Sequence, residues 1–524
     1  MKTARKSTSV PKRFIPAPPA PEMNLRKRTR EPPAPPPVKD DASDDLPRLP
    51  DDIIITILSL LDIRLLPRFA LLAKSFRDCP KLGQRLDFGQ PVFEQLARKG
   101  LYDSTVSRII DEHKGSKIRS LKLRFDPDNN EEHWAMVADW IIKVAQKEIE
   151  ELDFDFYQGN QAFLLSDDIF KIETLQILRL SYCDFVLPDL ETKFAVTGLP
   201  CLRILSFKKM SLQDLTVIEA LLESCLQLET LELLYCCFPT YFRIAAGHLK
   251  KFKECKLITC MEIMEVTIEA PSLTTLHYFG PMVIFKYTDF DKLTDCILDF
   301  KPQRPSLPIE AYKLDKLLYG MSNIEVLTTT SRLLEGLCSR RSDGDSTITN
   351  FFCLSKLKEI QLFMEGSGYC NLFTIVSFLR KCPSIEKIYI DCRGWLKMEK
   401  MAINSNRPGG YKWVVQQQCL LDRVLGPCYP NLKEVKLAGF RFDPHEMQLL
   451  YYFVETGLNL ETVAIFLPSP RICSGPVGFP DETTLNHYLR PRMASPNARI
   501  RVFPHFHDNL LYPPRHARNW NNQF

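Results

Sequence analysis

The sequence predicts an α/β fold in which an elongated array of strand-and-helix repeats follows a short helical unit. From about residue 117, the pattern apolar-x-x-apolar-x-apolar, typical of a short strand with one buried face, recurs along most of the chain. Amphipathic stretches with helical spacing separate several of these strands. Ahead of the array, the stretch from Leu49 to Cys79 carries a dense set of apolar residues at helical spacing. A chain of 524 residues is long enough for this organisation.

Composition narrows the classes of function. The formal net charge is only +4, so bulk charge gives no reason to expect a nucleic-acid partner. No run of about 18 apolar residues occurs, and we expect no membrane partner. The first residues lack the apolar core of a secretory signal, and the 17 cysteines are an odd number. Reduced thiols and a location in the nucleus and/or cytoplasm are therefore expected.

The first segment, residues 1–46, is rich in proline and charged residues and poor in large apolar side chains. Such a segment cannot bury enough surface to offset its ordering entropy, so we predict a disordered arm. It contains the basic cluster RKRTR, from Arg26 to Arg30. A nuclear localisation signal and a solvated basic arm are both open interpretations of this cluster.

The second segment, residues 47–85, predicts a small helical unit. Pro50, Asp51 and Asp52 are typical of a helix start, because proline suits the first turn and carboxylates complement the helix dipole. Asp62 and Pro67 divide the unit into short helices. So many apolar side chains in so few residues favour burial against a partner, although a cap on the following array is the alternative. The apolar residues at helical spacing are Ile53, Ile54, Ile57, Leu58, Leu61, Leu66, Phe69, Leu72 and Phe76.

This unit resembles the F-box, a three-helix motif that docks on the Skp adaptor of a cullin-RING ubiquitin ligase. Asp62 stands where the family usually has proline, Ala73 where cysteine is common, and Phe76 where tryptophan is common. The resemblance rests on Leu49-Pro50, Ile57-Leu58, Leu61, Arg68-Phe69 and Lys74-Ser75-Phe76-Arg77. It implies that the residues binding the adaptor are Leu49, Pro50, Ile53, Ile57, Leu58, Leu61, Leu66, Phe69, Lys74, Ser75 and Phe76.

The array from about residue 86 to 470 is predicted to be a solenoid. We call the middle apolar residue of each strand pattern its marker. Successive markers such as Leu152, Leu178 and Leu205 are about 26 residues apart, within the range of leucine-rich repeats. The markers are Leu121, Leu152, Leu178, Leu205, Leu231, Cys255, Leu276, Cys296, Leu327, Ile360, Ile388, Val435 and Val463.

Helices and insertions complete the repeat pattern. Amphipathic helices are expected from Leu215, from Asn371 and from Glu446, so the order of strand and helix is that of a solenoid, or horseshoe. Residues 339–350 and 393–413 lengthen two repeats, and functional loops and disorder are both open interpretations of them.

The cysteines fit the same pattern. Five residues past a marker, leucine-rich repeats place Asn or Cys. Cys183, Cys236 and Cys260 occupy this position, and Met210 occupies it in one repeat. We predict a buried structural ladder. Zinc is the alternative because Cys236 adjoins Cys237, but no paired C-x-x-C motif occurs, so neither a metal nor a cofactor is predicted. No catalytic motif is present either, and no catalytic residue is proposed.

Recognition is expected on the concave face of the array. Side chains alternate along a strand, so the residues flanking each marker point to the face opposite the core. Their mixed charges suit a protein partner, although simple solvent exposure is the alternative. The residues predicted to bind a substrate there are Arg179, Ser181, Ser206, Lys208, Glu232, Leu234, Lys256, Ile258, His277 and Phe279.

The whole arrangement resembles plant F-box proteins with leucine-rich repeats. Residues 431–466 are similar to the closing segment of these proteins, which is known as the FBD region. Residues 471–524 are expected to be a tail. The resemblance implies a non-catalytic substrate receptor of a Skp-cullin-F-box ubiquitin ligase. The F-box would bind the Skp adaptor and, through it, cullin, while the repeats would bind a protein substrate for proteasomal degradation. A repeat scaffold acting outside ubiquitination, and an enzyme, are the alternatives.

Overall fold

The structure is a computed structural model that describes most of the chain from Pro50 to His516. The chain divides into two compact units, Met1–Arg48 and Leu49–Phe524, and only the second contains described residues. The arm and basic cluster predicted for residues 1–46 therefore lie outside them. The described residues are 50–61, 65, 68, 71, 79–98, 100–125, 131–156, 162–185, 198–213, 215–260, 263–286, 290–301, 311–338, 352–364, 372–395, 429–469, 479–508 and 511–516.

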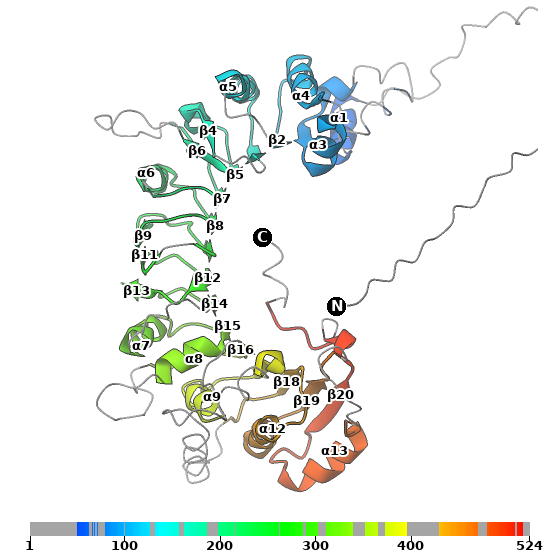
Figure 1. Ribbon diagram of the computed structural model, residues 1–524, viewed down its shortest axis with the longest axis vertical. Helices are drawn as coiled ribbons and strands as arrows, with labels where there is room; N and C mark the ends of the chain where they lie inside the picture. Colours follow the sequence, from blue (N-terminus) through cyan, green and yellow to red (C-terminus); the bar gives the residue numbers. More distant parts are fainter. Residues whose placement is uncertain are drawn as a thin grey trace, which may run out of the picture. The chain divides into compact units, whose positions relative to one another are not determined.

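A long parallel β-sheet forms the centre of the second unit, and the α/β class predicted from the sequence is confirmed (Figure 1). In spatial order, the strands of this sheet within the described residues are β1 (Arg85–Phe88), β2 (Ser120–Phe125), β3 (Glu151–Phe156), β5 (Ile177–Ser181), β7 (Ile204–Lys208), β8 (Thr230–Leu234), β10 (Glu254–Ile258), β12 (Thr275–Pro281), β14 (Asp295–Lys301), β15 (Val326–Thr330), β16 (Glu359–Phe363), β17 (Lys387–Asp391), β18 (Glu434–Ala438), β19 (Thr462–Phe466) and β20 (Arg499–Phe503).

The register of the sheet aligns the markers. Leu152 pairs with Leu178, Leu178 with Leu205, and the alignment continues strand by strand to Val463. Each marker is almost completely buried, because side chains on neighbouring parallel strands stack in rows when the strands do not slip. Replacing a buried leucine in such a row by alanine typically costs about 2–5 kcal/mol. The apolar strand pattern therefore predicted both the strands and their register.

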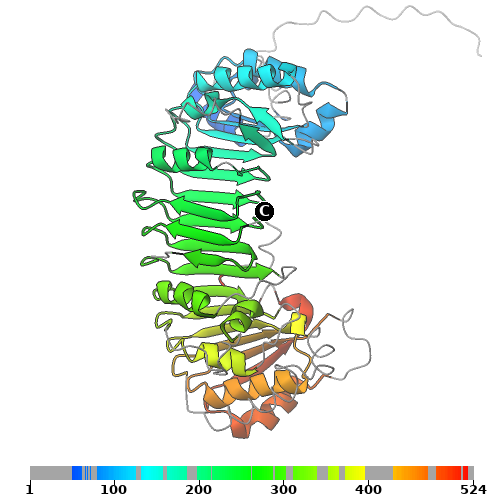
Figure 2. The same ribbon diagram turned by 60° about the vertical axis from the view of Figure 1, so that its left-hand side comes forward.

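One face of the sheet packs on a layer of helices, and Figures 1 and 2 show α5, α6, α7, α8, α9 and α12 on that side. No helix in the described part of the chain has the length and apolar character needed to cross a membrane. The α-helices within the described residues are α1 (Asp51–Leu60), α3 (Gln90–Ala97), α4 (Tyr102–Asp111), α5 (Glu131–Ala145), α6 (Thr216–Ser224), α7 (Ala311–Gly320), α8 (Ser331–Cys338), α9 (Leu372–Leu379), α12 (Pro444–Thr456) and α13 (Glu482–Leu489).

In part of the array, strands replace helices in this outer layer. β9 (Tyr241–Ala245), β11 (Glu265–Glu269) and β13 (Ile284–Lys286) pair in parallel as a small second sheet. A two-stranded sheet joins β4 (Phe163–Leu165) to β6 (Cys183–Phe185). The repeats that contain β9, β11 and β13 are shorter than the repeat that holds α6, and an extended segment covers the core there instead.

The three helices predicted between strands are confirmed as α6, α9 and α12. The start of α12 follows its sequence closely. Asp443 and Glu446 form a capping box, and the buried Glu446 carboxylate accepts the main-chain N–H of Arg441 at 2.6 Å. Burial raises the pKa of Glu446 to about 7 despite this hydrogen bond. The strand–helix–strand order of residues 431–466 is thus β18, α12 and β19.

The sheet extends further than the sequence pattern predicted. β20 pairs with β19, and α13 packs beside it, although a tail was expected from residue 471. The pattern was missed because Asn497 stands three residues before Ile500, where the earlier strands have an apolar residue. The insertion at 339–350 and most of the one at 393–413 lie outside the described residues. The predicted domain limits remain predictions.

Candidate functional site

The sheet face opposite the helices is the candidate binding surface. We call it the inner face, and on β5 it is formed by Ile177, Arg179 and Ser181, which alternate with buried residues. The same alternation places all ten predicted substrate-binding residues on this face. The half-buried members are Arg179, Ser181, Lys208, Glu232, Lys256 and His277. The buried members are Ser206, Leu234, Ile258 and Phe279.

Three of the buried members form an apolar row along the ends of the strands. Leu234, Ile258 and Phe279 pack with Ile297, and Tyr235 lies against the cluster. The three predicted residues are at most 5% exposed. They consequently stabilise the strand ends and offer little surface to a partner.

Ion pairs between and within strands occur on the inner face from β2 to β10. Lys256 lies 2.9 Å from Glu232 and 3.1 Å from Glu254, and Arg179 lies 2.6 Å from Glu151. Burial disfavours the charged form of Lys256, but its hydrogen bonds and the charges of both glutamates outweigh this and raise its pKa. Both signs of charge are therefore available within a small area, which suits a protein partner.

From β14 to β19 the inner face is different, because most positions on both faces of the strands are buried. A segment that follows β20 covers part of it. We call residues 504–516 the strap, and within it the structure describes 504–508 and 511–516. The strap begins where β20 ends, and Phe503 stacks on Phe466 of β19 with ring centroids 5.1 Å apart.

Lys436 of β18 anchors the first half of the strap. Its ammonium donates to the carbonyl oxygens of Asp508 at 2.7 Å, Leu511 at 3.2 Å and Tyr512 at 3.1 Å. It also lies 3.0 Å from the Asp508 carboxylate. The lysine is only 5% exposed, and its charge is balanced by this set of oxygen atoms.

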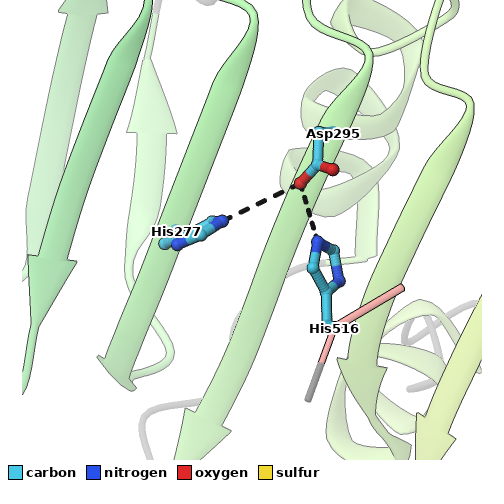
Figure 3. A group of neighbouring side chains, drawn as sticks. All are labelled: His277, Asp295 and His516. Carbon is cyan, nitrogen blue, oxygen red and sulfur yellow. Dashed lines mark hydrogen bonds and ion pairs between the residues drawn. The ribbon is translucent and has the colours of Figure 1, made fainter. Parts of the chain in front are cut away.

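Asp295 of β14 anchors the second half (Figure 3). The His516 Nε2 atom lies 2.8 Å from the Asp295 carboxylate, and the His277 Nε2 atom lies 3.8 Å from it. Arg515 approaches the other carboxylate oxygen at 3.3 Å. Burial opposes ionisation of Asp295, but hydrogen bonds and charges of the two histidines outweigh it, so the pKa of this carboxyl lies well below its ordinary range.

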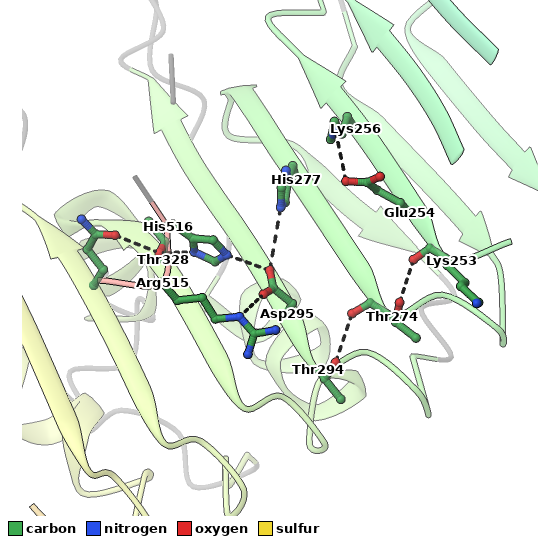
Figure 4. A network of polar contacts seen from close by, with 11 residues as sticks. Lys253, Glu254, Lys256, Thr274, His277, Thr294, Asp295, Thr328, Arg515 and His516 are labelled. Atoms are coloured by element: carbon green, nitrogen blue, oxygen red, sulfur yellow. Dashed lines mark hydrogen bonds and ion pairs between the residues drawn. The ribbon is translucent and has the colours of Figure 1, made fainter. Parts of the chain in front are cut away.

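The network continues onto β15 and β16 (Figure 4). The Thr328 hydroxyl lies 2.7 Å from the His516 Nδ1 atom and donates to the Gln361 amide oxygen at 3.3 Å. The main-chain N–H of Arg515 donates to the Glu359 carboxylate at 2.7 Å. Side chains from three neighbouring strands thus hold two consecutive residues of the strap.

His277, Asp295 and His516 have donor atoms close enough to one another to be considered for a metal ion, all within 4.8 Å. Two contacts oppose this use. The Arg515 guanidinium shares the same carboxylate, and His516 already bonds to it directly. We interpret the cluster as an ion-pair network.

Sequence reasoning missed most of this network. Asp295, Thr328, Gln361 and Lys436 sit beside markers of later strands, so the alternation that selected His277 would have found them. His516 is different, because it lies outside the repeat pattern and contacts a residue 221 positions away.

The predicted cysteine ladder is confirmed. Cys183, Cys236 and Cys260 are buried, and the Sγ atoms of the last two donate to the carbonyl oxygens of Phe207 and Leu233 in the preceding repeats. Burial raises the pKa of Cys236 to about 11, which keeps the thiol protonated at neutral pH.

The helical unit is described only in part. Helix α1 starts after Pro50, Leu58 is buried, Leu61 and Ile57 are half-buried, and Ile53 is 44% exposed. Of the predicted adaptor-binding residues, Leu49, Leu66, Phe69, Lys74, Ser75 and Phe76 lie outside the described residues. Adaptor binding by this set remains a prediction, as does its three-helix fold.

Comparison with known proteins identifies the array. A family model described as the LRR domain of At1g61320/AtMIF1 matches residues 109–467, which is more than half of the chain. The chain belongs to this leucine-rich-repeat family. The matched region of this chain begins within α4 and ends just after β19, so it contains the inner face from β2 to β19.

Relatives of this chain include several proteins from Arabidopsis thaliana. The FBD-associated F-box protein At1g61320 is 25% identical over 80% of this chain and 88% of its own length. The putative FBD-associated F-box protein At1g61330 is 25% identical over 80% and 90%. The putative F-box/LRR-repeat protein At3g58880 is 23% identical over 81% and 92%. The resemblance to plant F-box proteins with leucine-rich repeats is therefore confirmed.

Proposed function

We propose that this protein is a non-catalytic substrate receptor of a Skp-cullin-F-box ubiquitin ligase. The unit at residues 47–85 would fold as a three-helix F-box and bind the Skp adaptor, and through it cullin. The repeats would hold a protein substrate for ubiquitination and degradation, in the nucleus or the cytoplasm. The names of the relatives support the docking half of the proposal, since they are called F-box proteins.

The observation that carries the proposal is the apolar surface of the F-box-like stretch. Ile53 and Leu65 are 44% and 41% exposed, and Leu71 is 85% exposed. On α1, Ile54 and Leu58 pack into the core of the chain. Ile53 lies on another side of the same helix, where a partner could cover it. Exposed apolar residues gathered in one short stretch are typical of an interaction surface.

The proposal is tested by co-purification of the full chain with a recombinant Skp adaptor. We expect the wild type to bind. Ile53→Asp should weaken binding at least about tenfold, because it buries an unpaired charge at the contact. Gln95→Asp on α3 is the control, since Gln95 is exposed, polar and outside the F-box-like stretch, and it should bind like the wild type. The double variant Leu49→Ala/Pro50→Ala should also lose binding.

The outcomes separate the alternatives. Equal binding by the wild type and all variants would show that docking does not use this stretch. A folded wild type that does not bind the adaptor would favour a repeat scaffold acting outside ubiquitination. Thermal unfolding followed by circular dichroism checks that each variant remains folded.

A further inference from the structure

The second half of the strap makes the contacts of a bound peptide. From Tyr512 on, the strap meets strands of the sheet in reverse order: Tyr512 at β18, Arg515 at β16 and His516 at β15 and β14. The backbone bends at Leu511 and Tyr512 and again at Arg515 and His516, and Tyr512 has a φ of 50°. The segment therefore turns twice as it crosses these strands.

The sheet contacts both the main chain and the side chains of this segment. Lys436 binds the carbonyl oxygens of Leu511 and Tyr512, and Glu359 binds the main-chain N–H of Arg515, so these contacts do not depend on the side chains of residues 511–515. Asp295 and Thr328 bind the side chains of Arg515 and His516. In peptide recognition, main-chain contacts generally supply affinity, and side-chain contacts supply specificity.

The receiving residues are held in place by the sheet. Thr328 and Gln361 are register partners on β15 and β16, and Val326 joins Asp295 to Glu359 in the same way. Thr328, Gln361 and Asp295 are all nearly buried. The site is therefore organised by rigid strands, which limits the entropy lost when a ligand binds.

Both ring nitrogens of His516 have partners in the sheet. The Thr328 hydroxyl donates to Gln361 at 3.3 Å and lies 2.7 Å from His516 Nδ1. The Asp295 carboxylate can only accept, and His516 Nε2 lies 2.8 Å from it. The site thus contacts an imidazole at both nitrogens, with the Arg515 guanidinium beside it.

We propose that the inner face at β14–β16 is a binding site for a peptide segment carrying an arginine followed by a histidine, and that Arg515 and His516 fill it as a ligand in cis. A partner segment of the same chemistry must displace the strap before it binds. As a description of substrate class this rests on the proposed receptor function, but the site itself is independent of the adaptor.

Tethering makes the cis ligand effective. A short connection to the anchor at Lys436 gives Arg515 and His516 an effective concentration in the millimolar range. A free peptide therefore competes poorly until the cis contacts are weakened. Removing both side chains should reveal the site without disturbing the anchor, since Asp508 and Lys436 are unchanged.

The test measures binding of a fluorescein-labelled peptide, YPPRHAR (the sequence from Tyr512 to Arg518), to full-length protein by fluorescence anisotropy. The Arg515→Ala/His516→Ala variant should bind the peptide at least about tenfold more tightly than the wild type. Adding Asp295→Asn should remove the gain. The control peptide YPPAAAR should bind neither protein.

Equal binding by the wild type and the double variant would overturn the proposal. So would binding that survives Asp295→Asn, or no binding to a double variant that melts like the wild type. Because no adaptor is present, failure of the F-box proposal leaves these results unchanged. Hydrogen exchange provides a second readout: the Arg515 amide should be protected in the wild type and should exchange faster in the double variant.

Discussion

The charged side chains at the two ends of the inner face find their partners in different ways. From β2 to β10, charged side chains pair across strands and remain partly in contact with solvent. From β14 to β19, the corresponding positions are buried, and the chain's own C-terminal strap supplies partners for several of them. The first region is a surface that a partner can meet directly. The second is a surface from which a bound segment must first be moved.

The physical difference lies in the solvation of the charges. Lys122 on β2 pairs with Asp153 at 3.1 Å with 45% of its side chain exposed, whereas the Lys436 side chain is 6% exposed. Exposed pairs contribute little because water competes for both ions. Water cannot solvate a buried lysine in place of its partner, so loss of either member of the pair leaves an uncompensated charge. The two regions should therefore respond very differently to the same substitution.

The largest expected effect is that of Lys436→Met. The substitution leaves the Asp508 carboxylate buried without its cation, and we expect the free energy of unfolding to fall by about 3–5 kcal/mol. Lys122→Met is the matched control in the solvated region, with an expected change below about 1 kcal/mol. Urea unfolding followed by circular dichroism measures both. Similar decreases in the free energy of unfolding in the two variants would show that burial under the strap does not make the Lys436 ion pair more important than the Lys122 pair.

Asp295→Asn should have an intermediate effect that depends on pH. His277, His516 and Arg515 face this carboxyl, and the net effect of its surroundings is a lowered pKa. Hydrogen bonds to charged groups contribute about 1.5–3 kcal/mol, the loss expected for the variant at neutral pH. Because the folded pKa lies below the unfolded value of about 3.9, this stabilisation is present above that pH and is lost as the pH falls below it.

The measurement for this carboxyl is the difference in free energy of unfolding between the wild type and Asp295→Asn across the pH range. We expect a constant difference above about pH 5 and convergence of the two proteins below about pH 4. A difference that persists unchanged in acid would mean that the carboxylate charge does not stabilise the strap.

The same comparison marks the limit of sequence reasoning. Markers such as Leu178 were predictable because a buried position in every repeat must be apolar, and this constraint is local. The row of β9, β11 and β13 was not predicted, because whether a short segment covers the core as a strand or as a helix depends on the length of its neighbours. The contact between His516 and Asp295 is set by tertiary folding, and nothing in the repeat pattern points to it.

The helix side of the sheet provides the closing test, because there the two regions should be alike. Cys255 on β10 and Cys296 on β14 are markers from the two regions, and both are buried beneath the outer layer. Burial raises the pKa of Cys255 to about 12 and also raises that of Cys296. We expect neither thiol to react with iodoacetamide in the folded protein, whereas the exposed Cys237 should be alkylated, as measured by peptide mass spectrometry. Faster labelling of Cys255 than of Cys296 would mean that the open region differs in stability throughout its core, and that the contrast between the regions is not confined to the inner face.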